Sequence, residues 1–546
     1  MKYINIYYLV FALLLVGCND DFLDRYPETQ INDGNFFKSE SDLKIYNNGL
    51  YSSYFLREGF QNQGAFNAEV LTFDKYSDNA FMQTPDDIRL GINSANQPGF
   101  QEWDWSLVRD INQFLENASS ADVEEVVRNR YIAEARLIRA LEYYDKVKLY
   151  GDLPIIDRVL AVDDELLTAS QSPRDEVMEF INDDLDFAVQ WLPTSAEENR
   201  FNKYIAAAYK ARIMLHEGTF RKYHSLGQEK TYLQQAAIAS QLVMDSDDYM
   251  IDPSVGYGEL FSNLNLSGNK EIVFFKDYEE SLQLYHNVGN ILTHVNGAEF
   301  GGSKSLINDY LALDGLPIEE SDLYEGDETI EKEFANRDLR LRETFGIPNS
   351  YFIGDKIYLN SDPNGIVNTG TPSGYQLVKF YNEEQDPLAW NRNFIDAPLI
   401  RYAEVLLINA EAKAELQTIT QNDIDNTVNL LRVKAGVADL TLSGGIIEDI
   451  RRERRVELAF EGFRYDDLMR WKQGSLLAEP VLGLKFNDTD IADADAFEVG
   501  TDIQLNNEGY IISDNVYSFD ESKNYYFPIP VNELSLNPNL EQTPGW

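Results

Sequence analysis

The chain has 546 residues, of which 44% are hydrophobic and 12% aromatic, and it carries a formal net charge of −46. This apolar content excludes an intrinsically disordered protein. The negative charge argues against a nucleic-acid-binding function, because it repels phosphate backbones, and it also disfavours a polyanionic ligand. The length fits two or three domains, or a single body built from repeats.

The first seventeen residues predict a signal peptide. Lys2 gives a positive start, and the apolar run from Ile6 to Val16 is shorter than the ~20 residues of a membrane-spanning helix. The run ends at Leu15-Val16-Gly17-Cys18, which resembles a bacterial lipobox, and Cys18 is the only cysteine. We therefore expect cleavage before Cys18 and lipidation of this residue, so that acyl chains hold the protein on a membrane. The alternative is an ordinary secretory signal followed by a chance cysteine.

A lipidated tether is expected over 18–38, where Pro27 and Gly34 disfavour helix. Helical periodicity then dominates the N-terminal region 39–250. Two stretches carry apolar residues at helical spacing: Leu137, Ala140, Leu141, Tyr144 and Val147, and then Tyr204, Ala207, Ala208, Ala211, Met214 and Leu215. Gly151 and Pro154 are expected to end the first helix. Ser172, as an N-terminal cap followed by Pro173, predicts a helix that extends to about 192, and another is expected over about 230–245.

A second helical block is predicted in the C-terminal region 401–546. One apolar face is formed there by Ala403, Leu406, Leu407, Ala410 and Ala414, and helices near 423–435 and 446–463 follow. Alanines at contact positions in both blocks let paired helices approach closely, which is typical of tetratricopeptide-type stacking. The sequence therefore predicts a mostly α fold with a helical-repeat body.

The region 251–400 differs from both helical blocks. It is rich in Gly, Asn, Asp, Pro and aromatic residues, and it contains short strand-like runs such as 271–275. A similar loop-rich stretch spans 58–104. Because loops on a rigid scaffold commonly carry binding residues, we expect a loop-rich α/β insert to form a ligand site.

Four segments carry a family resemblance. They are Arg128–Pro154, which contains Tyr150-Gly-Asp-Leu-Pro154; Arg401–Ala412; Arg451–Trp471; and the closing run from Tyr526-Phe-Pro-Ile-Pro530 to Pro544-Gly-Trp546. In this order they resemble the SusD/RagB family of nutrient-binding outer-membrane lipoproteins of the starch-utilisation-system type. The resemblance extends from the lipobox to the last residue.

The resemblance implies a tetratricopeptide body with a loop-rich glycan site. It also implies a partner, a SusC-like TonB-dependent transporter on which the lipoprotein sits as a hinged lid. Oligo- or polysaccharide would be bound without a cofactor, at the surface of the cell outer membrane. Asn19-Asp20-Asp21 resembles the short acidic export tag of lipoproteins in SusD-bearing bacteria.

The arginine-rich segment Arg451–Arg464 has a structural interpretation. Its arginines and glutamates lie three and four residues apart, where they can pair along and between helices. Its apolar side consists of Val456, Ala459, Phe460 and Phe463. We expect this segment to dock the repeat array onto the irregular region through partly buried ion pairs. The cluster Arg337–Arg340 is expected to be structural as well, and nearby carboxylates argue against a catalytic or nucleic-acid-binding role for either.

Sugars present apolar C–H faces and hydroxyls, so a glycan site needs exposed aromatic rings beside Asp, Asn or Arg. Among aromatic residues in polar, loop-like sequence, Trp390 fits best, with Asn391 and Arg392 as hydroxyl partners. The further candidate ligand residues are Tyr285, His286, Asp74 and Phe81. For each of them the alternative is a structural role, such as a loop anchor. Trp105 is interpreted as the start of a helix and not as a ligand residue.

No catalytic or metal site is predicted. The sequence contains no Gly-x-Ser-x-Gly or His-Glu-x-x-His motif, its 4 histidines are not paired at metal spacing, and Asp362-Pro-Asn-Gly365 resembles only part of a calcium loop. A glycoside hydrolase needs two carboxylates about 5 to 10 Å apart, a weak criterion among 92 acidic residues. The alternatives to glycan capture are a repeat scaffold lipoprotein for peptides or proteins, and a glycoside hydrolase. The loops 58–104, 277–302 and 382–397 are expected to decide which glycan is bound.

Overall fold

Helices form most of the structure, in agreement with the predicted mostly α fold. The computed structural model describes residues 36–56, 74–82, 84–99, 103–197, 199–289, 300–347, 352–353, 356–357, 371–382, 384–385, 392–486, 500 and 504–546. The strands among these residues are short, with 2 to 5 residues each. The predicted tether therefore lies outside the described residues except for 36–38.

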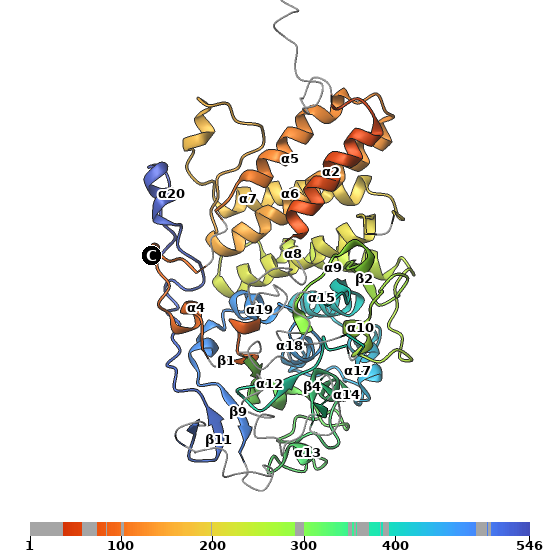
Figure 1. The fold of residues 1–546 in the computed structure, drawn as a ribbon, viewed down its shortest axis with the longest axis vertical. Coiled ribbons are helices and arrows are strands. Elements are labelled where there is room, and N and C mark those ends of the chain that lie inside the picture. The colour runs from red at the N-terminus through yellow and green to blue at the C-terminus, as the bar shows by residue number, and fades with distance from the viewer. Residues whose placement is uncertain are drawn as a thin grey trace, which may run out of the picture.

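The helical body contains the long helices of the chain (Figure 1). They are α2 (Glu40–Phe55), α5 (Ser106–Asn117), α6 (Glu125–Tyr150), α7 (Arg174–Trp191), α8 (Lys203–His224), α9 (Glu229–Met244), α15 (Tyr402–Glu415) and α18 (Ile446–Glu457). Helix α6 packs against α7, α8 against α9, α9 against α15, and α15 against α18. This stacking confirms the prediction of a helical body built from packed helix pairs.

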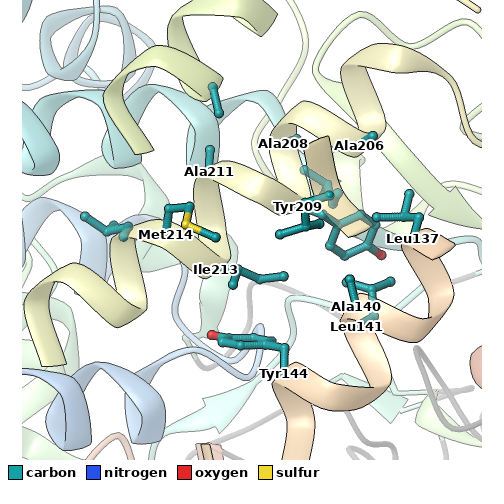
Figure 2. Packing of buried hydrophobic residues seen from close by; sticks show 14 of the residues in the cluster. Leu137, Ala140, Leu141, Tyr144, Ala206, Ala208, Tyr209, Ala211, Ile213 and Met214 are labelled. Carbon is teal, nitrogen blue, oxygen red and sulfur yellow. The ribbon is translucent and has the colours of Figure 1, made fainter. Parts of the chain in front are cut away.

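The predicted apolar faces form the core of this body. Leu137, Leu141 and Tyr144 of α6 are buried, and so is the predicted face of α8 except for the half-buried Tyr204. Figure 2 shows that Tyr209 and Ile213 of α8, which the prediction did not include, point toward these α6 side chains. Burying a side chain of this size stabilises the fold by about 1.5–3 kcal/mol relative to leaving it exposed. Helix α6 ends at Tyr150, followed by Gly151 at φ +78°, as the sequence predicts.

The predicted cap of α7 is wrong in detail. Pro173 occupies the N-cap position, and no side chain caps the helix from it. Ser172 instead forms a β-bridge with Leu153, and its backbone N–H and C=O are both used there. The Asp152 carboxylate accepts a hydrogen bond from the Arg174 amide at 2.7 Å, so the helix start is held by a residue 22 positions earlier.

Two predicted helices of the second block are shorter than expected. The helix near 423–435 is divided into α16 (Gln421–Asp425) and α17 (Val428–Ala435). The helix expected over 446–463 ends at Glu457, because Phe460 and Gly462 both have positive φ angles, +61° and +84°. The chain then enters α19 (Arg464–Arg470). This turn inserts Phe460 into a second core instead of leaving it on a helix face.

The second core joins loop-rich segments from distant parts of the sequence. The strands of the structure form the pairs β1 (Ala80–Met82) with β3 (Phe300–Gly302), β2 (Ile272–Lys276) with β8 (Ala397–Arg401), β4 (Phe345–Gly346) with β7 (Gln376–Leu377), and β5 (Phe352–Ile353) with β6 (Lys356–Ile357), and the sheet β10 (Gln504–Leu505), β11 (Tyr510–Ile512) and β9 (Leu482–Lys485). The short helices that contribute to the second core are α10 (Glu259–Ser262), α12 (Lys304–Asp309), α13 (Ile330–Glu333) and α14 (Leu339–Thr344). The helix α4 (Asp87–Leu90) packs instead against the core of the helical body through Ile88, and α20 (Val531–Leu536) lies near the C-terminus. The second core therefore extends beyond the loop-rich region 251–400 and includes Phe81, Leu484 and Ile511.

Buried ion pairs join α18 to the second core. Glu457 accepts from Arg340 and from Arg401, both at 2.7 Å, and Arg340 also pairs with Asp338. Arg455 of α18 contacts Asp78 at 3.1 Å and Asp309 of α12 at 2.6 Å. The expectation that the arginine-rich segment docks the two regions through ion pairs is thus confirmed, and so is the structural role of the cluster Arg337–Arg340.

Candidate functional site

Strand pairing links the three loop stretches that are expected to decide which glycan is bound, two at a time. The antiparallel pair β1–β3 joins residues 80–82, in the middle of the first loop region, to residues 300–302. The pair β2–β8 and an isolated bridge between His286 and Asn393 join the region after β2 to the stretch before β8. Two of these loop stretches, 277–302 and 382–397, thus meet at the His286–Asn393 bridge, and the first contributes residues 80–82, which pair with 300–302 although more than 200 residues separate β1 from β3.

The bridge between His286 and Asn393 forms the floor of this region. The two residues exchange backbone hydrogen bonds of 2.8 and 3.1 Å, and the Asn393 side-chain oxygen accepts from the Gly289 amide at 3.1 Å. A cavity of about 10 Å³ lies beside them, lined in part by Asn382 and Gln385. This cavity is far too small for a sugar ring, so a glycan would bind on the surface above it.

Two predicted ligand residues reach that surface. Arg392 is exposed, immediately before the bridge, and Tyr285 is half-buried immediately before His286. The Tyr285 ring packs against Phe394 at a centroid distance of 6.3 Å. Phe394 is not among the predicted residues, although it follows the polar stretch around Trp390. The structure thus brings Tyr285 and Arg392 onto adjacent chain segments.

The remaining part of the best predicted cluster cannot be placed. Trp390 and Asn391 lie outside the described residues, in the segment 386–391. The partial calcium-loop sequence Asp362–Gly365 also lies outside them. Ligand contact by Trp390 and Asn391 therefore stays a prediction.

Three other predicted ligand residues are buried and have structural contacts. Phe81 is 3% exposed and belongs to the second core. His286 is fully buried, its ring accepts from the Val288 amide at Nδ1, and its Nε2 lies 3.1 Å from the Ile395 carbonyl oxygen. Burial lowers the pKa of His286 to about 3, so the ring is neutral at physiological pH. A sugar cannot stack on Phe81 or bond to His286 here, and we assign both to packing.

Asp74 is the third of these buried residues. Its carboxylate accepts from the Asn79 side chain at 2.9 Å and from the Gly462 amide at 2.7 Å. It therefore fixes the middle of the first loop region to the turn between α18 and α19. Burial raises the pKa of Asp74 to about 7. We assign Asp74 to holding the loop rather than to ligand contact.

Asp396 plays a similar part at the other end of the region. Its two carboxylate oxygens accept from the amides of Tyr278 and Leu266 at 3.0 and 2.8 Å. Burial raises the pKa of Asp396 to about 7. The chain after β2 and the chain before β8 are thus held together by buried polar contacts, which gives the surface loops a fixed base.

The described residues bear on membrane spanning and metal binding, but not on the lipid anchor. Cys18 lies outside the described residues. Within the described ranges, no helix combines the length and the apolar character needed to cross a bilayer. Among the same residues there is no group of three or more His, Cys, Asp or Glu side chains arranged to hold a metal ion.

Two family models match the chain. The model of the SusD family matches residues 270–546. A second model, described as starch-binding associating with outer membrane, matches residues 21–215. The first model alone covers half of the chain, and it includes the segments from Arg401 to Trp546 that carry the resemblance.

Curated and solved proteins agree with these models. A SusD-like protein of Formosa agariphila is 26% identical and covers 100% of both chains. A SusD-like protein of Bacteroides ovatus is 24% identical, over 98% of this chain and 96% of the relative. The crystal structure of a SusD-like carbohydrate binding protein from Bacteroides fragilis superposes with a TM-score of 0.78 at 23% identity, covering 93% of this chain and 100% of the other. A surface glycan-binding protein from Bacteroides fluxus gives a TM-score of 0.65 at 18% identity, with 93% and 100% coverage. The match of the family model, with a helical body and a loop-rich second core in the expected places, shows that this chain belongs to the SusD family.

Proposed function

We propose that this protein is a lipid-anchored, surface-exposed component of the outer membrane that captures an oligo- or polysaccharide and delivers it to a SusC-like TonB-dependent transporter. The observation that carries the proposal is the bridge His286–Asn393, which sets Tyr285 and Arg392 on adjacent chain segments over a base held by β2–β8 and by the buried carboxylate of Asp396. Strand pairs and buried carboxylates hold the base of these loops in place. Because the base is fixed, the loops lose little conformational entropy when their aromatic and planar polar side chains bind a ligand.

The chemistry of that surface suits a neutral glycan. Arg392 is exposed and Tyr285 is half-buried, and Trp390 and Asn391 are expected beside them. A tryptophan face covers the C–H side of a sugar ring, while amides and a guanidinium bond its hydroxyls. A net charge of −46 disfavours a polyanion in the same place.

Membership of the family supports the proposed location and partner. One matching model is described as associating with outer membrane, and one structural neighbour is named a surface glycan-binding protein. Attachment through Cys18 rests on the lipobox in the sequence. We propose no catalytic step, since the sequence offers no nucleophile or metal motif. A repeat scaffold for peptides or proteins is the second candidate, supported by the stacked helices alone.

The glycan-binding proposal is tested on a glycan array with the purified protein, followed by calorimetry on each glycan that binds. Trp390→Ala should weaken binding roughly ten-fold or more, because a stacked ring is worth about 0.5–1.5 kcal/mol beyond the apolar area that it covers. Arg392→Ala should weaken it as well. Lys332→Ala, which removes an exposed cation from α13, is the control and should leave binding unchanged. Binding of no glycan, with capture of peptides instead, would favour the scaffold function.

Anchoring and delivery are tested in the membrane of the source cell. The wild-type protein should fractionate with the outer membrane, take up a clickable palmitate analogue and co-purify in detergent with a large TonB-dependent barrel. Cys18→Ala should lose the label and move to the soluble fraction. A wild-type protein that is isolated alone under conditions that preserve other outer-membrane complexes contradicts the transporter partnership, and retained membrane association of Cys18→Ala contradicts the anchor.

A further inference from the structure

A groove lies between the helical body and the C-terminal segment. It is lined in part by residues between 95 and 104, at the end of the first loop stretch, and by none of the residues that form the loop face around Tyr285 and Arg392. It consists of two adjoining hollows of about 490 and 630 Å³. Both hollows are lined by Trp103, Asp104 and Glu533, so the two are continuous past these residues. Each volume lies within the range of about 300–1,000 Å³ that is typical of ligand sites. In Figure 1 the groove's wall α20 lies at the left edge, whereas β2 and α10, near the loop face, lie at the right.

The walls of the groove are fastened to each other. One wall is α20 with the residues that follow it, and the other is the segment 154–169 after α6. Asn537 donates to the Ala169 carbonyl at 2.8 Å, and Asn539 donates to the Thr168 carbonyl at 2.7 Å. Gln171 donates to the Glu541 carbonyl at 2.6 Å. Because these bonds set the spacing of the walls, the groove exists before any ligand binds.

The floor carries two tryptophans. Trp103 is half-buried, and its ring packs edge-on against Trp105 at 5.7 Å and against Tyr150 at 5.0 Å. Trp105 is also half-buried and packs edge-on against Tyr143. These contacts fix the indoles, so little side-chain entropy is lost when a ligand covers their remaining surface.

Polar groups follow the groove along its length. Asp104 and Glu533 line both hollows, Arg109 and Arg158 the larger one, and Asn96 and Asn532 the smaller one. Carboxylates, guanidinium groups and amides are the planar partners that sugar hydroxyls use, and the indoles and nearby leucines suit C–H faces. Acidic and basic groups are mixed in one groove, which disfavours a ligand of either charge.

We propose that this groove is a second carbohydrate site, which holds a neutral oligosaccharide chain along its length. The class of ligand in this inference rests on the proposed function, and the location of the site rests on the shape and lining of the groove. A chain bound at two separated sites is held by avidity, because the second contact becomes intramolecular. The protein would then retain a long polysaccharide more strongly than a short one.

The test is calorimetry on the detergent-solubilised full chain, with purified linear hexasaccharides of maltose, cellulose, laminarin and xylan type as probes. We expect two sites per chain for the oligosaccharide that binds. Glu533→Ala combined with Arg109→Ala, both outside the core, should remove one site and leave the other. Arg392→Ala should weaken only the other site. Lys332→Ala is the control for both.

The outcomes separate this inference from the proposed function. One site per chain that is unaffected by the Glu533→Ala, Arg109→Ala double variant overturns the second site and leaves glycan capture intact. If the second site is lost in Arg392→Ala but not in the double variant, the inference of a second site in the groove is overturned as well. Absence of binding for every probe and for the glycan array overturns both. Since both substituted side chains are near the surface, an unchanged melting temperature verifies that the double variant is folded.

Discussion

At the residue scale, the buried charges explain how this chain stabilises a molecule with so much irregular structure. Glu457 is 4% exposed and lies between Arg340 and Arg401. Burial alone would raise the pKa of Glu457, but Arg401 and Arg340 outweigh it and hold the pKa at about 2. Replacing all the charged residues of such a buried group by apolar ones of similar volume typically changes the stability of the fold little. Removing only one partner, however, leaves a buried charge without compensation and is strongly destabilising.

Replacing Glu457 by alanine should therefore be strongly destabilising. We expect Glu457→Ala to lower the free energy of unfolding by about 3–5 kcal/mol at pH 7, measured by urea denaturation. Glu448→Ala on the same helix is the control, because the Glu448 side chain is 68% exposed and pairs with Arg451 at 3.3 Å. An exposed pair contributes at most about 1 kcal/mol. Equal losses in the two variants would contradict the proposed role of burial.

The same group predicts a pH dependence. The folded pKa of Glu457 is depressed to about 2, below the ordinary value of 4.5. Its contribution to stability is therefore complete above pH 4.5 and is lost as the pH falls toward 2. The difference in stability between the wild type and Glu457→Ala should shrink over that interval, and a difference that grows on acidification would refute the assignment.

At the element scale, close helix packing depends on small residues. Gly218 lies within α8, and a Cβ added to it would stand 2.8 Å from Leu233 Cγ and 2.9 Å from the Leu233 backbone nitrogen of α9. A backbone atom of a packed helix cannot move aside without separating the two helices. The close approach of α8 and α9 thus requires glycine at this position.

Gly218→Ala should accordingly destabilise the helical body despite the higher helix propensity of alanine. We expect a loss of about 1–3 kcal/mol, as is typical of overpacking. Gly49→Ala in α2 is a matched control, because nothing lies within 4 Å of the added Cβ. That variant should be stabilised by up to about 1 kcal/mol. Thermal unfolding of both variants measures the contrast, and a neutral or stabilising Gly218→Ala would contradict the packing argument.

The sequence predicts the long helices well because their apolar periodicity is local information. Prediction from the sequence fails where residues distant in the chain determine the backbone conformation. Ser172 pairs with Leu153 instead of capping α7. The backbone at Phe460 turns, so that its ring enters the second core instead of extending the face of α18. Two of the candidate site residues show the same limit. Phe81 and His286 stand in polar sequence, but β1–β3 and the bridge to Asn393 bury them. Trp105 is predicted correctly as the start of a helix, since it is the N-cap of α5, but local sequence does not show that the C-terminal segment lies beside it.

At the scale of the whole molecule, the two cores are not independent domains. Helix α18 contributes Ile450 to the core of the helical body and Val456 to the second core. Asp78 forms a second link between the two cores. It lies before β1 and contacts Arg455 of α18 at 3.1 Å and Arg464 of α19 at 2.7 Å. Segments more than 370 residues apart are joined in this way. Such a junction is expected to make the two cores unfold together.

Removing the Asp78 carboxylate should weaken this coupling. Burial would raise the pKa of Asp78, but Arg455 and Arg464 stabilise its ionised form. The pKa of Asp78 therefore lies well below its usual range. In Asp78→Ala, Arg455 keeps its contact with Asp309 at 2.6 Å, but Arg464 loses its ion-pair partner. We expect calorimetry to show a single unfolding transition for the wild type and two for the variant. The loop-rich core should unfold first, because its short strands and helices bury less apolar surface per segment than the stacked helices do. Asp322→Ala, an exposed carboxylate of the same region, should leave the single transition in place. One transition at a lower temperature in Asp78→Ala would mean that the shared helix α18, rather than the ion pairs, couples the two cores.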